Sequence, residues 1–291
     1  SCWGDNTYGQ RSPPTSQFTS IFAGDDFNCG ILVGGGQECW GRNQYQQSTG
    51  VLSLTFTELS LGDTVGCGLD STNTVRCWGE GVHAAYNAPN DTFVQFDMSE
   101  HNGCAVTAIG EVECWGNNEH GQASPPTYEY TQVNVGWNHA CAVNVTGDIE
   151  CWGRNNRDQA PSLRSGSYSQ VASGFEHSCA IKTDQTVECW GSNDLSQGDA
   201  PTGTLFIDLS AGYYHTCGVT TAGTIECWGF DVDGQASPST ATPTPATGNA
   251  WAEISAGYAH TCALGFNGDV SCWGSSSNAQ HSEPSGIHLG L

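Results

Sequence analysis

Basic side chains are scarce in this sequence of 291 residues, which has 7 Lys and Arg against 30 Asp and Glu and a formal net charge of −23. Charged residues make up 13% of the chain, about half the usual share of roughly 25%. Binding to nucleic acid through phosphate contacts needs a basic patch. The composition therefore excludes such a binder and argues against attachment to an anionic membrane surface. No run of 18 apolar residues is present, so we predict no membrane insertion.

Cysteine, in contrast, is abundant, with 15 residues. Fourteen of them form pairs whose members are ten residues apart, and Cys2 is left over. The pairs are Cys29 and Cys39, Cys67 and Cys77, Cys104 and Cys114, Cys141 and Cys151, Cys179 and Cys189, Cys217 and Cys227, and Cys262 and Cys272. The second cysteine of each pair opens a Cys-Trp-Gly tripeptide that recurs every 37 or 38 residues, stretching to 45 before Cys272. Such a period is typical of a propeller, a solenoid or a repeat array.

The ten-residue spacing predicts an antiparallel hairpin in which the two cysteines face each other. If Cys29 faces Cys39, a three-residue loop remains, and its last position favours a positive φ and hence Gly. That position holds Gly35, Asn73, Gly110, Gly147, Gln185, Gly223 and Gly268. We therefore predict one cross-strand disulfide per repeat rather than a zinc site, which needs closely spaced, converging ligands. Oxidised cysteines in turn predict a secreted or extracellular surface protein.

Each repeat carries the signals of three strands and a short fourth, and no segment has helical periodicity. A strand that opens with an aromatic residue precedes the hairpin, and a tail that usually ends in Gln follows Cys-Trp-Gly. We predict a single domain over residues 1–291, with an N-terminal tail or closing strand at 1–17 and a Ser/Thr/Pro-rich loop at 237–248. The repeats are placed at about 18–55, 56–92, 93–129, 130–167, 168–205, 206–250 and 251–291.

The repeat resembles that of a known family. Residues 256–264 read Ala-Gly-Tyr-Ala-His-Thr-Cys-Ala-Leu and residues 268–274 read Gly-Asp-Val-Ser-Cys-Trp-Gly, which is similar to the repeat of the regulator of chromosome condensation superfamily. The paired cysteines and short period more closely resemble the crinkly repeats of plant receptor kinase ectodomains and their secreted relatives. The resemblance implies an all-β fold, a seven-bladed β-propeller. It does not imply the nuclear exchange-factor role, because this chain is acidic, rich in paired cysteines and lacks a basic tail.

Several positions are candidates for modification or for a link between chains. Asn90 and Asn144 begin N-glycosylation acceptor sequences. The O-glycosylation candidates of the Ser/Thr/Pro-rich loop are Ser239, Thr240, Thr242, Thr244 and Thr247. Cys2 has no partner in its own repeat, so we expect a missing upstream segment or an intermolecular contact. The sequence begins without a signal peptide or initiator Met and is interpreted as processed or as a fragment.

The sequence gives little support for an active site. Four histidines share one repeat position, which favours a hydrogen-bonding role in the scaffold over metal binding; they are His139, His177, His215 and His260. No nucleophile motif is present, and we predict no enzymatic activity, no cofactor and no metal site. Calcium is the alternative at Asp231-Val-Asp233-Gly234, although Thr242 stands where the twelfth-position acid of a calcium loop is expected.

The residues that vary most between repeats lie in the turn after the first strand. Two turn residues per blade are expected on one rim of the ring, acidic in the first three blades and aromatic in the last four. The candidate ligand-binding residues are Asp25, Asp26, Asp63, Glu100, Trp137, Phe175, Glu176, Tyr213, Tyr214 and Tyr258. Aromatic platforms beside acids suit a glycan, and rigid Tyr and Trp suit a peptide or protein. The alternative is that these rings merely cover blade edges.

We therefore predict a non-enzymatic extracellular recognition module that binds a glycan or an extracellular protein on one rim of the propeller. One alternative is a structural subunit of a glycosylated extracellular filament or surface coat, which would self-associate without added ligand. A second alternative is a secreted protein inhibitor.

Overall fold

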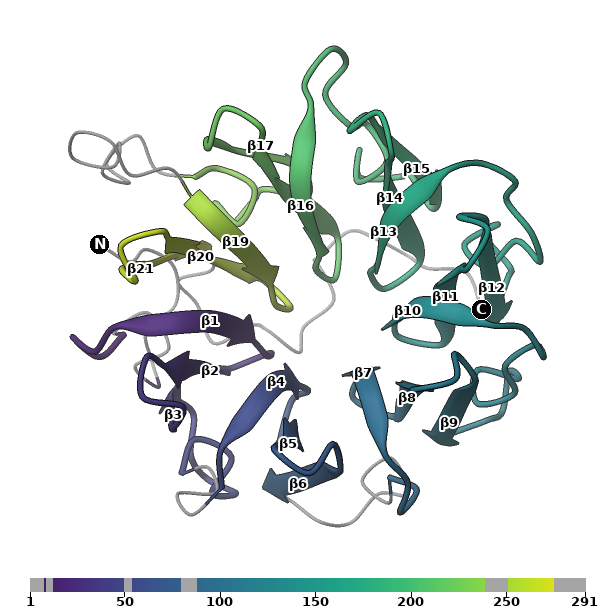
Figure 1. The fold of residues 1–291 in the computed structure, drawn as a ribbon. Coiled ribbons are helices and arrows are strands. Elements are labelled where there is room, and N and C mark those ends of the chain that lie inside the picture. Colours follow the sequence, from purple (N-terminus) through teal and green to yellow (C-terminus); the bar gives the residue numbers. More distant parts are fainter. Residues whose placement is uncertain (1–7, 9–12, 50–53, 80–87, 239–250, 275–291) are drawn as a thin grey trace.

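Seven small sheets surround a central channel in the computed structural model of the chain (Figure 1). The structure describes residue 8 and residues 13–49, 54–79, 88–238 and 251–274. Each sheet has three antiparallel strands that follow one another in the sequence, so one continuous segment forms each blade. The all-β, seven-bladed propeller predicted from the sequence is thereby confirmed. Within these ranges no helix has the length and apolar character needed to cross a membrane.

The first strand of every blade lies nearest the channel and the third lies farthest from it (Figure 1). Blades 1 to 3 consist of β1 (Phe18–Ala23), β2 (Phe27–Leu32), β3 (Gln37–Gly41), β4 (Phe56–Leu61), β5 (Val65–Asp70), β6 (Val75–Gly79), β7 (Phe93–Met98), β8 (Asn102–Thr107) and β9 (Val112–Gly116). Blades 4 and 5 consist of β10 (Tyr130–Val135), β11 (His139–Asn144), β12 (Ile149–Gly153), β13 (Tyr168–Ser173), β14 (His177–Lys182) and β15 (Val187–Gly191). Blades 6 and 7 consist of β16 (Phe206–Ala211), β17 (His215–Thr220), β18 (Ile225–Gly229), β19 (Trp251–Ala256), β20 (His260–Gly265) and β21 (Val270–Gly274).

The hairpin of the second and third strands has the register that the cysteine spacing predicts. Cys29 faces Cys39 and Ile31 faces Gln37, and the other six blades repeat this pairing. All seven predicted disulfides are present. The last loop residue has a positive φ in every blade, including Gln185 at 69°. Its carbonyl also links blades, since that of Gln185 accepts the N–H of Phe206 at 2.9 Å.

The expectation of a short fourth strand in each blade is wrong, because in the described residues the tail after Cys-Trp-Gly mostly folds into turns. In blade 4 the segment after these turns does pair with β12, but only through an isolated antiparallel bridge between Ile149 and Arg164. The terminal Gln of the tail is buried and stabilises these turns with its own side chain. Gln197 Oε1, for example, accepts the N–H of Leu195 at 2.8 Å. The Gln197 carbonyl then accepts the indole N–H of Trp228 in the next blade at 2.9 Å. The tail of one repeat is thus hydrogen-bonded to the following blade.

Apolar side chains fill the space between neighbouring blades. Between blades 5 and 6, Ile181 of β14 packs against Phe206 and Leu209 of β16 and against Trp228 of β18. All four are nearly inaccessible to solvent, and burying a side chain of this size contributes about 1.5–3 kcal/mol. A hairpin that is apolar on both faces is therefore covered on both faces by its two neighbours.

The four histidines that share one repeat position connect adjacent blades. Each Nε2 lies within 2.8–2.9 Å of a side-chain oxygen in the next blade. The pairs are His139 with Ser178, His177 with Thr216, His215 with Thr261, and His260 with Asn28. The scaffold role predicted for these residues is confirmed, although their partners are side chains across a blade interface.

The channel is lined by polar side chains of the innermost strands, around a cavity of about 260 Å³. Most of these side chains accept a backbone N–H from the innermost strand of the next blade. The Phe96 N–H reaches Glu58 Oε2 at 3.3 Å, and the Val133 N–H reaches Gln95 Oε1 at 2.9 Å. A bond of this kind has a net value of about 0.5–1.5 kcal/mol, so the ring is held at its centre by many small contributions.

Candidate functional site

The two-residue turns between the first and second strands surround one mouth of the channel. An N–H closes each turn by bonding to the carbonyl three residues on, as from Gly136 to His139 at 2.8 Å; the donor is Gly in six blades and Ser99 in blade 3. Adjacent turns approach each other closely, because a Cβ on Gly136 would lie 2.5 Å from the carbonyl oxygen of Gly174. Glycine at this point lets the turns meet. The first turn residue of each blade is thereby brought to the mouth.

Four of these first turn residues form an aromatic cluster, which consists of Trp137, Phe175, Tyr213 and Tyr258 from blades 4 to 7. The rings of Phe175 and Tyr213 are stacked with their centroids 4.0 Å apart. Trp137 meets both edge-on at 5.4 and 5.5 Å, and Tyr258 lies 4.2 Å from Tyr213. Such ring pairs contribute about 0.5–1.5 kcal/mol beyond area burial. The cluster is therefore a preorganised surface in which Tyr213 is central.

A cavity of about 120 Å³ lies at this mouth, lined by the aromatic cluster together with Asp25 and Glu100. It leads toward the channel, because the last residues of six innermost strands line both spaces. These residues are Ala23, Leu61, Val135, Ser173, Ala211 and Ala256. Five of the six are apolar, and Ser173 supplies a hydroxyl. The mouth is thus an aromatic and acidic vestibule above a mostly apolar constriction, which we call the collar.

The acidic part of the mouth carries strong local repulsion. Burial, followed by the negative charges of Asp63, Glu100 and Asp26, raises the pKa of Asp25 well above its usual range. The Arg42 guanidinium acts in the opposite direction. At the centre of the cluster, burial raises the pKa of Tyr213 far above that of an exposed phenol.

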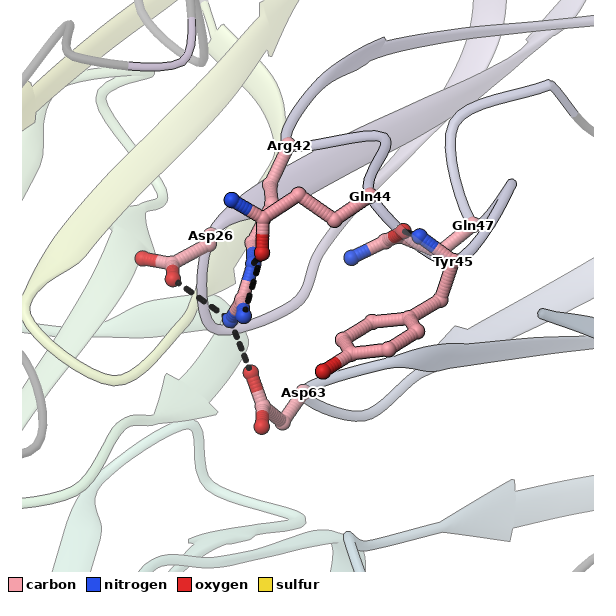
Figure 2. A network of polar contacts seen from close by, with 6 residues as sticks. All are labelled: Asp26, Arg42, Gln44, Tyr45, Gln47 and Asp63. Carbon is pink, nitrogen blue, oxygen red and sulfur yellow. Dashed lines mark hydrogen bonds and ion pairs between the residues drawn. The ribbon is translucent and has the colours of Figure 1, made fainter. Parts of the chain in front are cut away.

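Arg42 links the acids of blades 1 and 2 (Figure 2). Its Nη1 atom lies 3.3 Å from Asp26 Oδ2 and 3.3 Å from Asp63 Oδ1. Its Nε and Nη2 atoms donate to Gln44 Oε1 at 3.3 and 3.0 Å. The guanidinium also lies 5.5 Å from the Tyr45 ring centroid. Arg42 is therefore bound within the molecule by carboxylates and an aromatic ring.

The second turn residues have a different environment from the first. Asp26 is buried beside Arg42, and Glu176 is buried within 3.7 Å of Arg154 and 3.8 Å of Arg157. Tyr214 is buried as well and packs edge-on against Tyr213 with centroids 4.5 Å apart. These three candidates are positioned to support the turns. Asp63 lies beside the cavity with Arg42, whereas the other six line the cavity itself.

Three residues near this mouth are absent from the candidates predicted from the sequence, although His101 is one of the expected turn residues. Ser173 ends β13 in the collar, Arg42 bridges two acids, and the His101 ring lies 5.1 Å from that of Trp137. A signal existed for Arg42, because it follows a Cys-Trp-Gly tripeptide and so starts a tail that packs beside the rim. Ser173 ends a strand whose counterparts end in Ala, Leu, Met or Val, and this exception could have been noticed.

Other candidate sites lie elsewhere or outside the described residues. Asp231 Oδ1 accepts the N–H of Ala236 at 2.7 Å, as Asn193 Oδ1 accepts that of Gly198 at 2.8 Å. Asp231 is therefore a turn-forming residue in its tail, and calcium binding there stays a prediction. In the part of the chain that the structure describes, no three His, Cys, Asp or Glu side chains are grouped to hold a metal ion.

The glycosylation candidates differ in their surroundings. Asn90 is exposed before β7, whereas Asn144 is 3% exposed and its Oδ1 accepts the N–H groups of Thr146 and Asp148 at 3.0 Å. Burial disfavours access to Asn144, which leaves Asn90 as the better acceptor. Cys2 and the loop positions Ser239, Thr240, Thr242, Thr244 and Thr247 lie outside the described residues, and their roles stay predictions.

Comparison with known proteins supports the repeat assignment. The regulator of chromosome condensation (RCC1) repeat matches residues 130–159, 168–197, 206–235 and 251–280. The chain therefore contains RCC1-type repeats, as its sequence pattern indicates. A search of curated protein sequences gives no match.

Several solved structures share the fold. The CRINKLY WD40 ectodomain of the Arabidopsis thaliana receptor kinase ACR4 is 20% identical, with a TM-score of 0.71 over 91% of this chain and 100% of that one. The ectodomain of the Physcomitrella patens receptor kinase CR4 is 23% identical, with a TM-score of 0.73 over 90% and 75%. Prp20p from Saccharomyces cerevisiae is 15% identical, with a TM-score of 0.73 over 96% and 92%. The chain thus shares the propeller fold of these structures, and four of its repeats match the RCC1 repeat.

Proposed function

We propose that this protein is a non-enzymatic extracellular recognition module that binds a protein ligand at the aromatic mouth of the propeller. The observation that carries the proposal is the aromatic cluster, in which four blades each contribute one ring beside carboxylates. Aromatic anchors at the centre of a rigid surface dominate the energy of protein recognition. Seven disulfides support an oxidising, extracellular location.

Two observations favour a protein over a glycan. A sugar needs an open aromatic face, and the stacking of Phe175 on Tyr213 covers one face of each ring. The cavity of about 120 Å³ is also smaller than the roughly 300–1,000 Å³ of a typical small-molecule pocket. Propellers of this fold include the two receptor ectodomains and Prp20p, whose described binding partners are Gsp1p and histones. An extended protein surface with one inserted side chain suits the mouth better.

Substitution of one anchor tests the proposal. The purified propeller would be screened against a display library of secreted and cell-surface proteins, and the Kd of each captured partner would be measured. Trp137→Ala is expected to weaken binding about 30-fold or more, equal to about 2 kcal/mol. Phe266→Ala, which removes a 69%-exposed ring on another turn, is the matched control and should leave the Kd unchanged.

The melting temperature of both variants separates binding from folding. Trp137 is only half-buried, so its variant should unfold close to the wild-type temperature. Tyr258→Ala provides a second anchor variant if Trp137→Ala unfolds early. Partners that bind the wild type, Trp137→Ala and Tyr258→Ala equally well would place recognition elsewhere. Self-assembly of the wild type without added partner would favour a filament or coat subunit.

A further inference from the structure

The outer strand of blade 4, β12, is covered by a segment of its own chain. Ile149 and Arg164 exchange two backbone hydrogen bonds, of 3.0 and 2.7 Å, in an antiparallel bridge. The Cys151 N–H donates to the Pro161 carbonyl at 3.2 Å. Ile149 is 0% and Cys151 is 4% exposed. The segment therefore satisfies the N–H groups that point outward from this strand and shields them from solvent.

The outer strand of blade 5, β15, presents the same groups without a covering segment. Val187 and Cys189 take the repeat positions of the two paired residues of blade 4. Residues of an antiparallel pair alternate between bonding to the partner strand and pointing away from it, and the bond from the Lys182 N–H to the Thr186 carbonyl fixes this alternation. The N–H groups of Val187 and Cys189 therefore point outward. Among the described residues neither has an acceptor, and both residues are only half-buried.

The connection that follows β15 takes a different path from the one in blade 4. Thr202 precedes Phe206 by four residues, as Arg164 precedes Tyr168. Thr202 and Gly203 nevertheless form an exposed turn, in which Gly203 has a φ of 84°. The connection is thus long enough to pair with the strand, but it turns away and leaves the edge open. An open strand edge is a template on which another strand can pair.

Blade 4 also shows where the side chains of an added strand point. Residues directly opposite each other in a pair share one face of the sheet, so Arg164 points to the same side as Ile149. That side is blade 5, because Ile149 packs in a cluster with Trp190 of β15. Arg164 accordingly pairs with Glu188 of blade 5. A side chain opposite the first residue of the outer strand therefore meets the carboxylate of the next blade.

The corresponding carboxylate beside the open edge of blade 5 is that of Glu226. Val187 packs against the cluster that contains Trp228 of blade 6, so a side chain opposite Val187 would face blade 6. Trp228 is already covered, with 7% exposure, whereas Glu226 is half-buried and accepts the Thr204 hydroxyl at 3.3 and 3.4 Å. Each Lys and Arg of the described residues pairs with another acid. Glu226 is therefore placed to attract a basic side chain.

Blade 3 offers a comparison, since its following connection is also fully described and forms no bridge with β9. Val112 and Cys114 have the same outward N–H groups, and both residues are half-buried. The carboxylate of the next blade is that of Glu150, which is 8% exposed and accepts the Tyr130 hydroxyl at 3.1 Å. Both edges can thus accept a backbone, but blade 5 alone of the two adds an accessible acid.

We infer that the outer edge of blade 5 binds an extended segment of a protein partner as an added antiparallel strand, with a Lys or Arg opposite Val187 and beside Glu226. In this mode of recognition, backbone hydrogen bonds give affinity and side chains give specificity. The net charge of −23 attracts a basic segment and increases its association rate. This edge is separate from the aromatic mouth, so the inference goes beyond the proposed function and does not depend on it.

Amide hydrogen exchange of the whole protein, followed by NMR, tests the added strand directly. In the free protein the amides of Ile149 and Cys151 should exchange slowly and those of Val187 and Cys189 rapidly. The probe is acetyl-Ala-Pro-Ser-Leu-Arg-Ser-amide, which copies residues 160–165 of the covering segment. Added at up to millimolar concentration, it should slow the exchange of the Val187 and Cys189 amides in a saturable manner.

Modified peptides separate backbone pairing from charge recognition. Methylation of the arginine backbone nitrogen removes the N–H that pairs with the Val187 carbonyl and should abolish the protection. Replacing the arginine by norleucine keeps an apolar stem without the charge and should weaken binding about threefold.

Matched protein variants identify the acid. Glu226→Gln should weaken binding of the arginine peptide about threefold and leave the norleucine peptide unaffected. Glu129→Gln makes the same change of charge at an exposed position between blades 3 and 4 and should leave both affinities unchanged. Trp137→Ala alters the mouth and should bind the arginine peptide like the wild type.

Each remaining outcome contradicts the inference. Unprotected Val187 and Cys189 amides, or equal binding of the methylated peptide, would mean that no strand is added. Equal binding of the norleucine peptide, or normal binding of the arginine peptide by Glu226→Gln, would show that the acid does not select a basic side chain. Equal protection of Val112 and Cys114 would show that blade 5 is not preferred. Loss of binding in Trp137→Ala would place the peptide at the mouth instead.

Discussion

Each carboxyl side chain of the channel accepts a backbone N–H from the next blade, while burial disfavours its charged form. Burial raises the pKa of Glu58 and of Glu253 to about 8, from 4.5 in an exposed chain. The stability linked to these two groups is fully present below about pH 4.5 and is lost as the pH rises from there through 8, because the unfolded chain ionises while the folded chain keeps its protons. At the level of single residues, alkaline conditions therefore weaken the centre of the ring.

The histidines at the blade interfaces act in the opposite direction. Burial lowers the pKa of His139 to about 3, of His177 to about 4 and of His215 to about 3, from 6.5. Their contribution to stability is lost as the pH falls below 6.5, because the unfolded chain then binds protons that the folded chain does not. Between about pH 4.5 and 6.5 the three histidines outweigh the two glutamates, so we expect the contribution of these five groups to be maximal near pH 6.5.

Replacing both channel glutamates should flatten the alkaline side of this profile. Gln fits the position, because Gln95 and Gln132 accept the equivalent N–H groups at 2.9 Å in other blades. Between pH 6.5 and 8.5 the melting temperature of the Glu58→Gln, Glu253→Gln variant should fall less than that of the wild type. Thermal unfolding followed by circular dichroism measures both slopes. Identical slopes would show that these carboxyls do not titrate differently on folding.

At the level of the strands, the residues of adjacent blades are matched in pairs across each interface. A His is followed in the next blade by Ser, Thr or Asn, whereas the equivalent pairs without His are Phe27 and Gly66, Val65 and Gly103, and Asn102 and Ala140. The hydrogen bond between the His ring and the side-chain oxygen explains this pattern. The identity of one residue therefore depends on a partner about one repeat away.

A double-mutant cycle on His177 and Thr216 tests the matching. His177→Phe should destabilise the protein by about 1–3 kcal/mol, because the buried Thr216 hydroxyl loses its partner. Adding Thr216→Gly reproduces the pair found between blades 1 and 2 and should recover part of the loss. Chemical denaturation of the two single variants and the double variant gives the coupling energy, expected to be about 1 kcal/mol. Strict additivity would mean that the two side chains act independently.

The strands also show what the sequence could and could not predict. The cysteine spacing and the loop glycines predict the hairpin register, because a disulfide and a positive φ each constrain local geometry strongly. Gln185 adopts the same φ against its preference, since its carbonyl bonds to Phe206 in the next blade. In blade 5 turns replace the predicted fourth strand, because the side chains of Gln197 and Asn193 bond to their own tail. Hydrogen bonds from side chains to the backbone of the same tail compete with the backbone hydrogen bonds of a sheet.

For the molecule as a whole, the rim on which the turn residues meet follows from the repeat, but their contacts do not. Sequence reasoning assembles Trp137, Phe175 and Tyr213 on one side of the ring, while stacking between two of them depends on ring diameter and rotamers. The same limit applies to Ser173, because only the structure shows that this residue lines the cavity. Repeats thus predict positions well and the shape of a site poorly.

The disulfides should contribute to the stability of the entire ring. Replacing both cysteines of one central blade, Cys179→Ala with Cys189→Ala, opens a loop whose ends are ten residues apart. The chain-entropy estimate gives a loss of up to about 3 kcal/mol for such a loop. Chemical denaturation of the variant and the wild type measures the difference, and peptide mapping without reductant verifies the six remaining bridges. An unchanged free energy of unfolding would mean that the bridge adds no stability.

Because each blade is one continuous segment, the ring is closed between blades 7 and 1 without a strand shared across that junction in the described residues. Its contacts there are bonds such as those from His260 to Asn28 and from Phe18 to Gly268. If the molecule is pulled from its two ends, this junction separates first and the blades then unravel in turn. The disulfide of each blade keeps the residues between its two cysteines from extending, so each step releases less contour length than its repeat contains. Such a chain is expected to lengthen under force in short steps of similar size.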